Sequence, residues 1–383
     1  MLRPLKAMAI LAVSAASIPT YALEVNHSGQ FRARQEHYDI VEGRPDKRDF
    51  TTMRLRMGFE IKLSEDRKVF FSPQAVKTFG QAGTSVDYAG TLTFHEAYAD
   101  IPLANFRFKA GRQAIIYGDQ RLFGGRNWGA EGQSFDGFKL THKLFFGEID
   151  FGYLKIANTD TAVFDDDISL VFAYYRMLNS NSHELDTYFL RNNDSSLAND
   201  NDTMTGGFRY KLKGESFNLE TENMYQENET TKNSAHHLNI AADTRLGKLK
   251  VFLKGFLASR TYDQLYANRH SHHGDIDIVG RKNLAGASVG GQYYFTEKWD
   301  LKTEFFQFRR ASKNSPGYAQ NGSTALAGNM DELDLGQEID VTLTYRPRAK
   351  ETLNLAASAF MHGSYFAREN TSTFIYAQYT LNF

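Results

Sequence analysis

Residues 53–63 alternate strictly between apolar and polar side chains, and this alternation constrains the possible folds more than any other feature. The run reads Met53-Arg54-Leu55-Arg56-Met57-Gly58-Phe59-Glu60-Ile61-Lys62-Leu63, with apolar residues at the odd positions and charged residues or glycine at the even ones. Successive side chains of a β-strand point to opposite faces, so the run predicts a strand with one apolar and one highly charged face. A helix would distribute these charges around its circumference.

The same period of two recurs along the chain. Comparable segments include residues 208–212, 249–254, 338–345 and 373–383. In a soluble β-sandwich the apolar faces would pack against a second sheet, whereas in a membrane barrel lipid would cover them. Alternation alone leaves both architectures open.

The connections between these segments favour the barrel, because short and long ones alternate. The short ones span residues 64–67, 102–105, 213–215, 246–248, 296–298 and 347–350, and the long polar ones span residues 41–50, 117–133, 193–202, 260–282 and 310–334. Outer-membrane barrels have tight periplasmic turns and longer outer loops. We therefore predict an all-β fold, a transmembrane antiparallel β-barrel of about 18 strands with both termini in the periplasm. A closed barrel also pairs every backbone polar group in hydrocarbon.

The first 22 residues have the features of a secretory signal peptide. Arg3 and Lys6 precede an apolar stretch of about ten residues, and small residues stand at Thr20 and Ala22. We therefore assign residues 1–22 to a signal peptide and residues 23–383 to a single barrel domain. This places the protein in the outer membrane of a Gram-negative cell as an integral protein. The chain has no cysteine, which argues against a secreted fold held by disulfides.

Composition and missing motifs exclude several function classes. With 44 Lys and Arg against 45 Asp and Glu, the chain lacks the bulk positive charge of a nucleic-acid binder. The sequence contains no phosphate-binding loop, nucleophile elbow or dinucleotide-binding glycine set. We therefore predict no enzyme activity and no cofactor. The 30 Phe and 20 Tyr suit the aromatic girdles of a barrel.

Charged side chains on the predicted strands are assigned to the lumen, because Lys or Arg on the lipid face near the midplane costs about 2 to 4 kcal/mol. The candidate pore-lining residues are Arg32, Arg34, Arg54, Arg56, Glu60, Glu96, Asp100, Arg209, Glu220, Glu222, Glu338 and Asp340. Guanidinium groups pair with carboxylates, so the early arginines would suit a chain of uronate groups. Alternatively, these charges pair across neighbouring strands and stiffen the wall. The loop at residues 117–133 is a candidate to constrict the channel.

Three motifs resemble those of a known family. The first comprises Gly111-Arg112-Gln113, Tyr117-Gly118-Asp119-Gln120-Arg121-Leu122, Trp128 and Phe135-Asp136-Gly137. The second comprises residues 265–270, 274–277 and 283–284, and the third comprises residues 335–340 with Tyr345 and the closing residues 379–383. Together they resemble the alginate export family of outer-membrane proteins, over essentially the whole chain after residue 22.

The resemblance implies an eighteen-stranded barrel that passively secretes the anionic polysaccharide alginate through an arginine-lined constriction. It adds Arg112, Asp119 and Arg121 as candidate electropositive-pore and loop-ordering residues. Simple alternation from Phe106 would place Arg112 on the outer face, whereas a bulge nearby or a strand that ends above the membrane would allow it to turn inward. The sequence leaves this choice open.

Several partners follow from the barrel prediction and from the resemblance to the family. We expect contacts with membrane lipids and lipopolysaccharide, an anionic polysaccharide as the solute, possible periplasmic secretion partners, and the barrel-assembly machinery through the C-terminal Phe383. The alternative function is a porin that takes up small sugars, sugar acids or other solutes. A barrel enzyme or an adhesin that acts through its outer loops is the third hypothesis.

The run His270-Ser271-His272-His273, with Asp275 and Asp277, carries side chains that could bind a metal ion. It coincides with the second motif in a long outer loop, and we interpret it as part of that loop. Asp165-Asp166-Asp167 and residues 199–202 lack the spacing of an EF-hand and are interpreted as turns. We therefore predict no metal site.

Overall fold

The computed structural model describes residues 24–40, 46–79, 91–158, 167–194, 202–367 and 370–383; the predicted signal peptide lies outside them. The described residues form eighteen strands: β1 (Glu24–Ile40), β2 (Asp46–Lys62), β3 (Lys68–Phe79), β4 (Thr91–Leu103), β5 (Phe106–Gln113), β6 (Phe135–Lys143), β7 (Glu148–Asn158), β8 (Asp167–Asn179), β9 (His183–Asp194), β10 (Thr203–Lys213), β11 (Phe217–Asn228), β12 (Ser234–Leu246), β13 (Leu249–Ala258), β14 (Leu284–Tyr294), β15 (Trp299–Arg310), β16 (Asp334–Tyr345), β17 (Glu351–His362) and β18 (Thr371–Asn382). Among these residues, no helix is long and apolar enough to cross a membrane.

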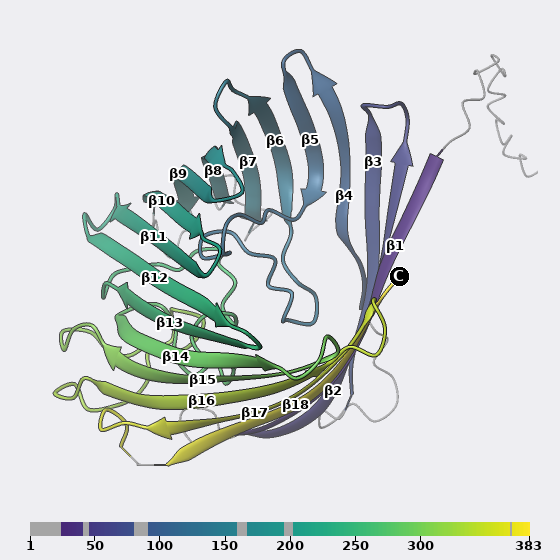
Figure 1. Cartoon of the computed structure of the whole chain (residues 1–383). Helices are drawn as coiled ribbons and strands as arrows, with labels where there is room; N and C mark the ends of the chain where they lie inside the picture. Colours follow the sequence, from purple (N-terminus) through teal and green to yellow (C-terminus); the bar gives the residue numbers. More distant parts are fainter. Residues whose placement is uncertain (1–23, 41–45, 80–90, 159–166, 195–201, 368–369) are drawn as a thin grey trace, which may run out of the picture.

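The strands close into one barrel (Figure 1). Each strand pairs antiparallel with the next along the chain, and β18 pairs with β1. Closure leaves no unpaired sheet edge, which is the condition for a sheet in hydrocarbon. The predicted fold class, an antiparallel barrel of about 18 strands, is confirmed.

The two ends of the barrel carry connections of different length. Short turns at residues 63–67, 104–105, 144–147, 180–182, 214–216, 247–248, 295–298 and 346–350 lie at one end. Gln30 of β1 is opposite Asn382 of β18, so the start of β1 and the end of β18 both lie at this short-turn end. The long connections at residues 114–134, 259–283 and 311–333 begin at the other end.

One predicted loop was too long. Residues 41–50 were expected to be a single connection, but β2 begins at Asp46 and pairs with the outer end of β1, where Ile40 is opposite Asp46. The charged residues 46–49 belong to a strand end that lacks the apolar alternation of residues 53–63. Pairing with β1, rather than local pattern, therefore determines where β2 begins.

The two faces of the wall follow the predicted alternation. Leu55, Leu253 and Ile375 are exposed on the outer face, where lipid would cover them. Arg54 and Phe374, their immediate neighbours in sequence, are buried on the inner face. The inner face is thus a packed environment rather than an open, uniformly polar one.

Apolar clusters inside the barrel explain this burial. One cluster joins Ile115, Leu122 and Phe123 to inward side chains of β6–β9 and β11–β13, and another joins Ile276 and Ile278 to inward side chains of β13–β18. Both clusters form because long connections fold back into the barrel and bring apolar side chains with them. The alternating pattern could not show this, because it assigns a face to each residue but not the content of the lumen.

The C-terminal residue completes the closure. The backbone N–H of Gly29 donates to the Phe383 carbonyl at 2.8 Å, and the N–H of Phe383 donates to the Gly29 carbonyl at 2.9 Å. The Phe383 ring covers Gly29, where an added Cβ would stand 2.4 Å from the ring. Gly29 therefore leaves the space that this aromatic ring occupies.

Candidate functional site in the barrel lumen

Two long connections enter the barrel and contact each other. We call residues 114–134 the first lumen loop and residues 259–283 the second lumen loop. The Gly124 N–H donates to the Tyr266 carbonyl at 3.0 Å, and the Asn268 N–H donates to the Gln120 carbonyl at 2.9 Å. In Figure 1 the first lumen loop runs between β5 and β6 through the space that the strands enclose. These contacts narrow the lumen from two sides.

The predicted arginines of β1 and β2 hold the first lumen loop. Register places Arg32 opposite Arg54, with Arg56 two residues further along β2 on the same inner face. Arg32 Nη2 donates to the Gly129 carbonyl at 2.9 Å, and Arg56 Nη2 donates to the Glu131 carbonyl at 2.8 Å. We call Arg32, Arg54 and Arg56 the arginine cluster.

The arginine cluster keeps its positive charge. In the described part of the chain, no carboxylate forms an ion pair with Arg32, Arg54 or Arg56; carbonyl and amide oxygens accept their hydrogen bonds. Such oxygens satisfy N–H donors but do not cancel formal charge. Nε of Arg32 and Nε of Arg54 have no hydrogen-bond partner among the described residues. The cluster is therefore both electropositive and incompletely bonded.

Arg34 differs from its neighbours. It pairs with Glu36 on the same strand, and its guanidinium carbon lies 3.6 Å from the centroid of the Trp128 ring. Trp128 belongs to the first lumen loop, so this cation–π contact is a further attachment of that loop to β1.

Arg209, on the opposite wall, is surrounded by carboxylates. Arg209 Nη1 lies 2.9 Å from Glu184 Oε2 and 3.1 Å from Asp186 Oδ2, and its Nε lies 2.7 Å from Glu220 Oε1. Glu220 also pairs with Lys211 at 3.0 Å. The charge of Arg209 is thus compensated within the wall.

Three predicted acidic residues form local contacts on the inner wall. Glu60 pairs with Lys68 at 2.7 Å, and Asp100 pairs with Arg107 at 2.7 Å. Glu96 accepts the backbone N–H of Ala114 at 2.9 Å, at the start of the first lumen loop. These carboxylates are bound by the wall and its loop rather than facing an empty channel.

Three further predicted carboxylates are buried. Glu222 accepts the Tyr188 hydroxyl at 2.8 Å. Glu338 accepts the backbone N–H of Ile276 at 2.9 Å and so holds the second lumen loop. Asp340, two residues along β16, lies on the same inner face and is also buried.

The assignment of Arg112 to the pore is corrected by the structure. Arg112 has the same parity on β5 as Phe106 and Phe108, and it is opposite Ala97 and Asp136 in the sheet. Its guanidinium pairs with Asp136 at 2.6 Å, with both side chains about half exposed on the outer face. Because β5 continues without a bulge to Gln113, alternation holds and Arg112 remains outside.

Asp119 and Arg121 lie in the first lumen loop. Arg121 is buried and pairs with Asp119 at 3.2 Å. Arg281, which the sequence did not single out, donates from Nη1 to the Arg121 carbonyl at 3.1 Å and lies fully buried in the second lumen loop. Its only signal in sequence was its position between two parts of the second motif.

His270 links the two lumen loops. Its ring stacks on Trp128 with centroids 3.7 Å apart, and its Nδ1 lies 2.8 Å from Asp277 Oδ2. Burial lowers the pKa of His270, but the adjacent carboxylates of Asp277 and Asp275 outweigh burial, and the pKa is raised. Among the described residues, no group of three or more His, Asp or Glu is arranged to hold a metal ion.

Comparison with known proteins identifies the family. The model of the alginate export family matches residues 23–251 and 258–380. The chain belongs to the alginate export family. No curated protein matches the sequence.

Several solved structures share the fold of this alginate export family protein. Pseudomonas aeruginosa OccK8 (OprE) aligns with a TM-score of 0.66 and 9% identity, covering 94% of this chain and 98% of that one. The outer membrane protein OprD from Pseudomonas aeruginosa aligns with a TM-score of 0.65 and 9% identity, covering 93% and 94%. Acinetobacter baumannii OccAB4 aligns with a TM-score of 0.64 and 12% identity, covering 96% of this chain and 100% of that one. At these identities the likeness concerns the fold, and with the family it supports an outer-membrane channel.

Proposed function

We propose that the protein is a passive channel, integral to the Gram-negative outer membrane, for an anionic, alginate-like polysaccharide or oligosaccharide. The observation that carries this proposal is the arginine cluster, whose members form no ion pair with a carboxylate of the described residues. An uncompensated positive group in a narrow, low-dielectric passage raises the local concentration of anions.

The geometry also suits transient binding. Arg32 and Arg54 are buried against the first lumen loop, whereas Arg56 is only half-buried and is the member of the cluster that a solute can reach. A uronate carboxylate can therefore accept hydrogen bonds from one guanidinium while the loop carbonyls keep the others in place. Weak, repeated sites of this kind allow a polymer to advance from one group to the next. The sequence offers no nucleotide-binding motif to drive transport, so the gradient would set the direction.

The remaining expectations belong to this proposal. An exporter would receive polymer from periplasmic secretion partners, and its outer wall would contact lipids and lipopolysaccharide. Phe383, which pairs with Gly29 where β18 meets β1, would be the residue that the barrel-assembly machinery recognises. The predicted signal peptide at residues 1–22 would direct the chain to this route.

Planar-bilayer recordings test the proposal. Purified protein should conduct with anion preference under a salt gradient, and mannuronate oligomers should block the current while neutral oligosaccharides of equal length should not. A pore without preference for anions and without block would contradict it.

A porin for small sugars or sugar acids is the second candidate, and the two lumen loops favour it. They are hydrogen-bonded to each other across the lumen, which limits the size of a solute that can pass. Liposome swelling separates the candidates: entry of glucuronate with exclusion of mannuronate oligomers would favour the porin.

A further inference from the structure

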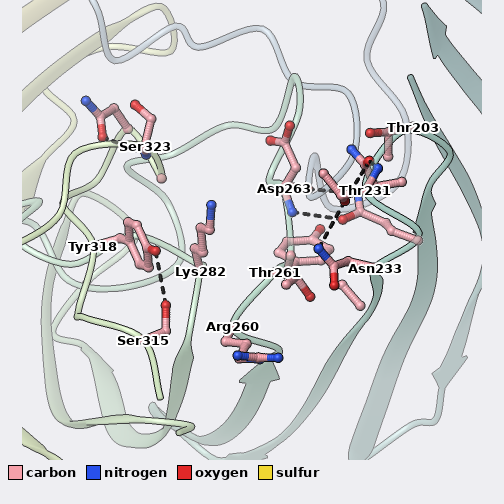
Figure 2. A pocket seen from close by; sticks show the side chains of 16 residues that line it. Thr203, Thr231, Asn233, Arg260, Thr261, Asp263, Lys282, Ser315, Tyr318 and Ser323 are labelled. Carbon is pink, nitrogen blue, oxygen red and sulfur yellow. Dashed lines mark hydrogen bonds between the residues drawn. The ribbon is translucent and has the colours of Figure 1, made fainter. Parts of the chain in front are cut away.

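A cavity of about 460 Å³ lies among the outer loops, at the long-connection end of the barrel (Figure 2). It is framed by the outer ends of β10 to β12, by the second lumen loop and by the connection at residues 311–333. Its volume falls within the range of small-molecule sites. None of the residues predicted from the sequence as pore-lining contributes to it.

Hydroxyl and amide side chains dominate the lining. They include Thr203, Gln226, Asn228, Thr231, Asn233, Thr261, Ser315, Asn321 and Ser323. Such groups both donate and accept hydrogen bonds, as the hydroxyls of a sugar require. The cavity therefore suits a polyhydroxylated ligand better than an apolar one.

Hydrogen bonds between elements preform this cavity. Gln226 of β11 donates from Nε2 to the Asp263 carbonyl at 2.8 Å, and its Oε1 accepts the Asp263 N–H at 2.8 Å. Gln264 of the second lumen loop donates to the Gln320 carbonyl at 2.5 Å. The three sides of the cavity are thus tied together, which lowers the entropic cost of binding.

Two cations face this space. In Figure 2, Lys282 and Arg260 stand between the side that carries Ser315 and Tyr318 and the side that carries Thr231. Neither cation has an ion-pair partner in the described part of the chain, and Lys282 Nζ lies 4.7 Å from the centroid of the Tyr318 ring. Asp263, the one carboxylate in the lining among the described residues, already accepts the Leu265 N–H through Oδ1 at 2.9 Å.

We propose that this cavity binds an acidic sugar residue of the transported chain. The inference rests on the proposed function and names the substrate class at a second place on its path. The carboxylate would pair with Arg260 and Lys282, the hydroxyls with the threonine and asparagine side chains, and the sugar ring would pack against Tyr318. Its position among the outer loops places it where a chain leaves or enters the barrel.

Calorimetric titration of the full chain in detergent micelles with a mannuronate trimer tests the site. The wild-type protein should bind the trimer, and the double variant Arg260→Gln with Lys282→Met should bind it at least about tenfold more weakly, because two charge-assisted contacts are lost. Mannotriose, the neutral analogue, should bind no more tightly to the wild type than to the variant. Arg348→Gln is the matched control, because Arg348 is 82% exposed at the opposite end of the barrel.

Unchanged trimer affinity in the double variant, with heat-modifiable migration like that of the wild type, would overturn the inference. If the wild type bound mannotriose as tightly as the mannuronate trimer, the inference would also be overturned, since the cations would then be irrelevant. Bilayer block by the trimer distinguishes this result from failure of the channel proposal. If the trimer blocks the current through Arg54 and Arg56 but binds the double variant normally, only the outer-site inference is contradicted. If the trimer binds at the outer site but the protein conducts no current, only the channel proposal is contradicted.

Discussion

The arginine cluster of β1 and β2 and Arg209 of β10 occupy the same inner face of one barrel but have opposite surroundings. Arg32 and Arg54 donate to carbonyl oxygens of the first lumen loop, whereas Arg209 pairs with Glu184, Asp186 and Glu220. The first arrangement leaves net positive charge in the lumen, and the second cancels it. An arginine on the lumen face can therefore attract solute or stiffen the wall, and its partners decide which.

The loop explains why the arginine cluster lacks carboxylates. Backbone carbonyls of residues 127–131 occupy positions where carboxylates would otherwise complete ion pairs. The loop thus fixes the guanidinium groups without neutralising them. On the wall around Arg209 the first lumen loop contributes Tyr117 and Phe123 to an apolar cluster, and the strands themselves supply the charge partners.

Substitution of Arg209 should produce the largest effect. Arg209→Met leaves buried Asp186 without its cation, while Glu184 and Glu220 keep only Lys213 and Lys211, and we expect the barrel to lose about 3 to 5 kcal/mol of unfolding free energy. Urea unfolding followed by tryptophan fluorescence measures this loss. Adding Glu220→Gln to the same variant should recover part of this loss. An unfolding free energy of Arg209→Met equal to that of the wild type would show that these ion pairs do not stabilise the wall.

Substitution of the arginine cluster should instead loosen a loop. Arg32→Gln with Arg54→Gln removes charge-assisted hydrogen bonds to the first lumen loop, each contributing about 1.5 to 3 kcal/mol, while relieving repulsion between like charges. We expect faster proteolysis within residues 114–134 and larger current fluctuations, with nearly unchanged global unfolding. A large loss of global stability would mean that the two regions do not differ as described.

The contact between the lumen loops should depend on pH. Because the pKa of His270 is raised in the folded state, its stabilising contribution is complete below the ordinary imidazole pKa of about 6.5 and is lost as the pH rises through the raised value. Current fluctuations should therefore increase from acid to alkaline pH. His270→Gln should remove this dependence, and its persistence in that variant would assign it to another group.

The smallest effect is expected at Arg112. Its pair with Asp136 lies on the outer face with both side chains about half exposed, so Arg112→Gln should cost under about 1 kcal/mol and leave ion selectivity unchanged. Urea unfolding and the reversal potential measure the two quantities. A change in selectivity comparable to that of an arginine-cluster variant would indicate that Arg112 faces the pore after all.

Much of the fold could be predicted from the sequence. The alternation at residues 53–63 identifies a strand with two chemically different faces, and the lengths of the connections distinguish a membrane barrel from a sandwich. Both signals are local, since they depend on the pleat and on turn length. The outward position of Arg112 follows from the same parity, once the structure excludes a bulge.

The content of the lumen could not be predicted in this way. The Gly129 and Glu131 carbonyls accept hydrogen bonds from Arg32 and Arg56 only because a long loop folds into the lumen. The period of the sequence carries no information about where that loop folds. The same holds for Arg281, which is buried only because two loops meet. Parity places a charge on a face, but its partners come from segments far away in the chain.

The reversal potential of the purified channel under a salt gradient tests the central claim most directly. The wild-type protein should select anions, and Arg32→Gln with Arg54→Gln should reduce the ratio of anion to cation permeability by about fivefold per charge, the effect of roughly 1 kcal/mol each. Glu220→Gln, on the compensated wall, should raise the ratio. Equal reversal potentials for the wild type and the arginine variant would contradict the claim that uncompensated arginines set the selectivity of this barrel.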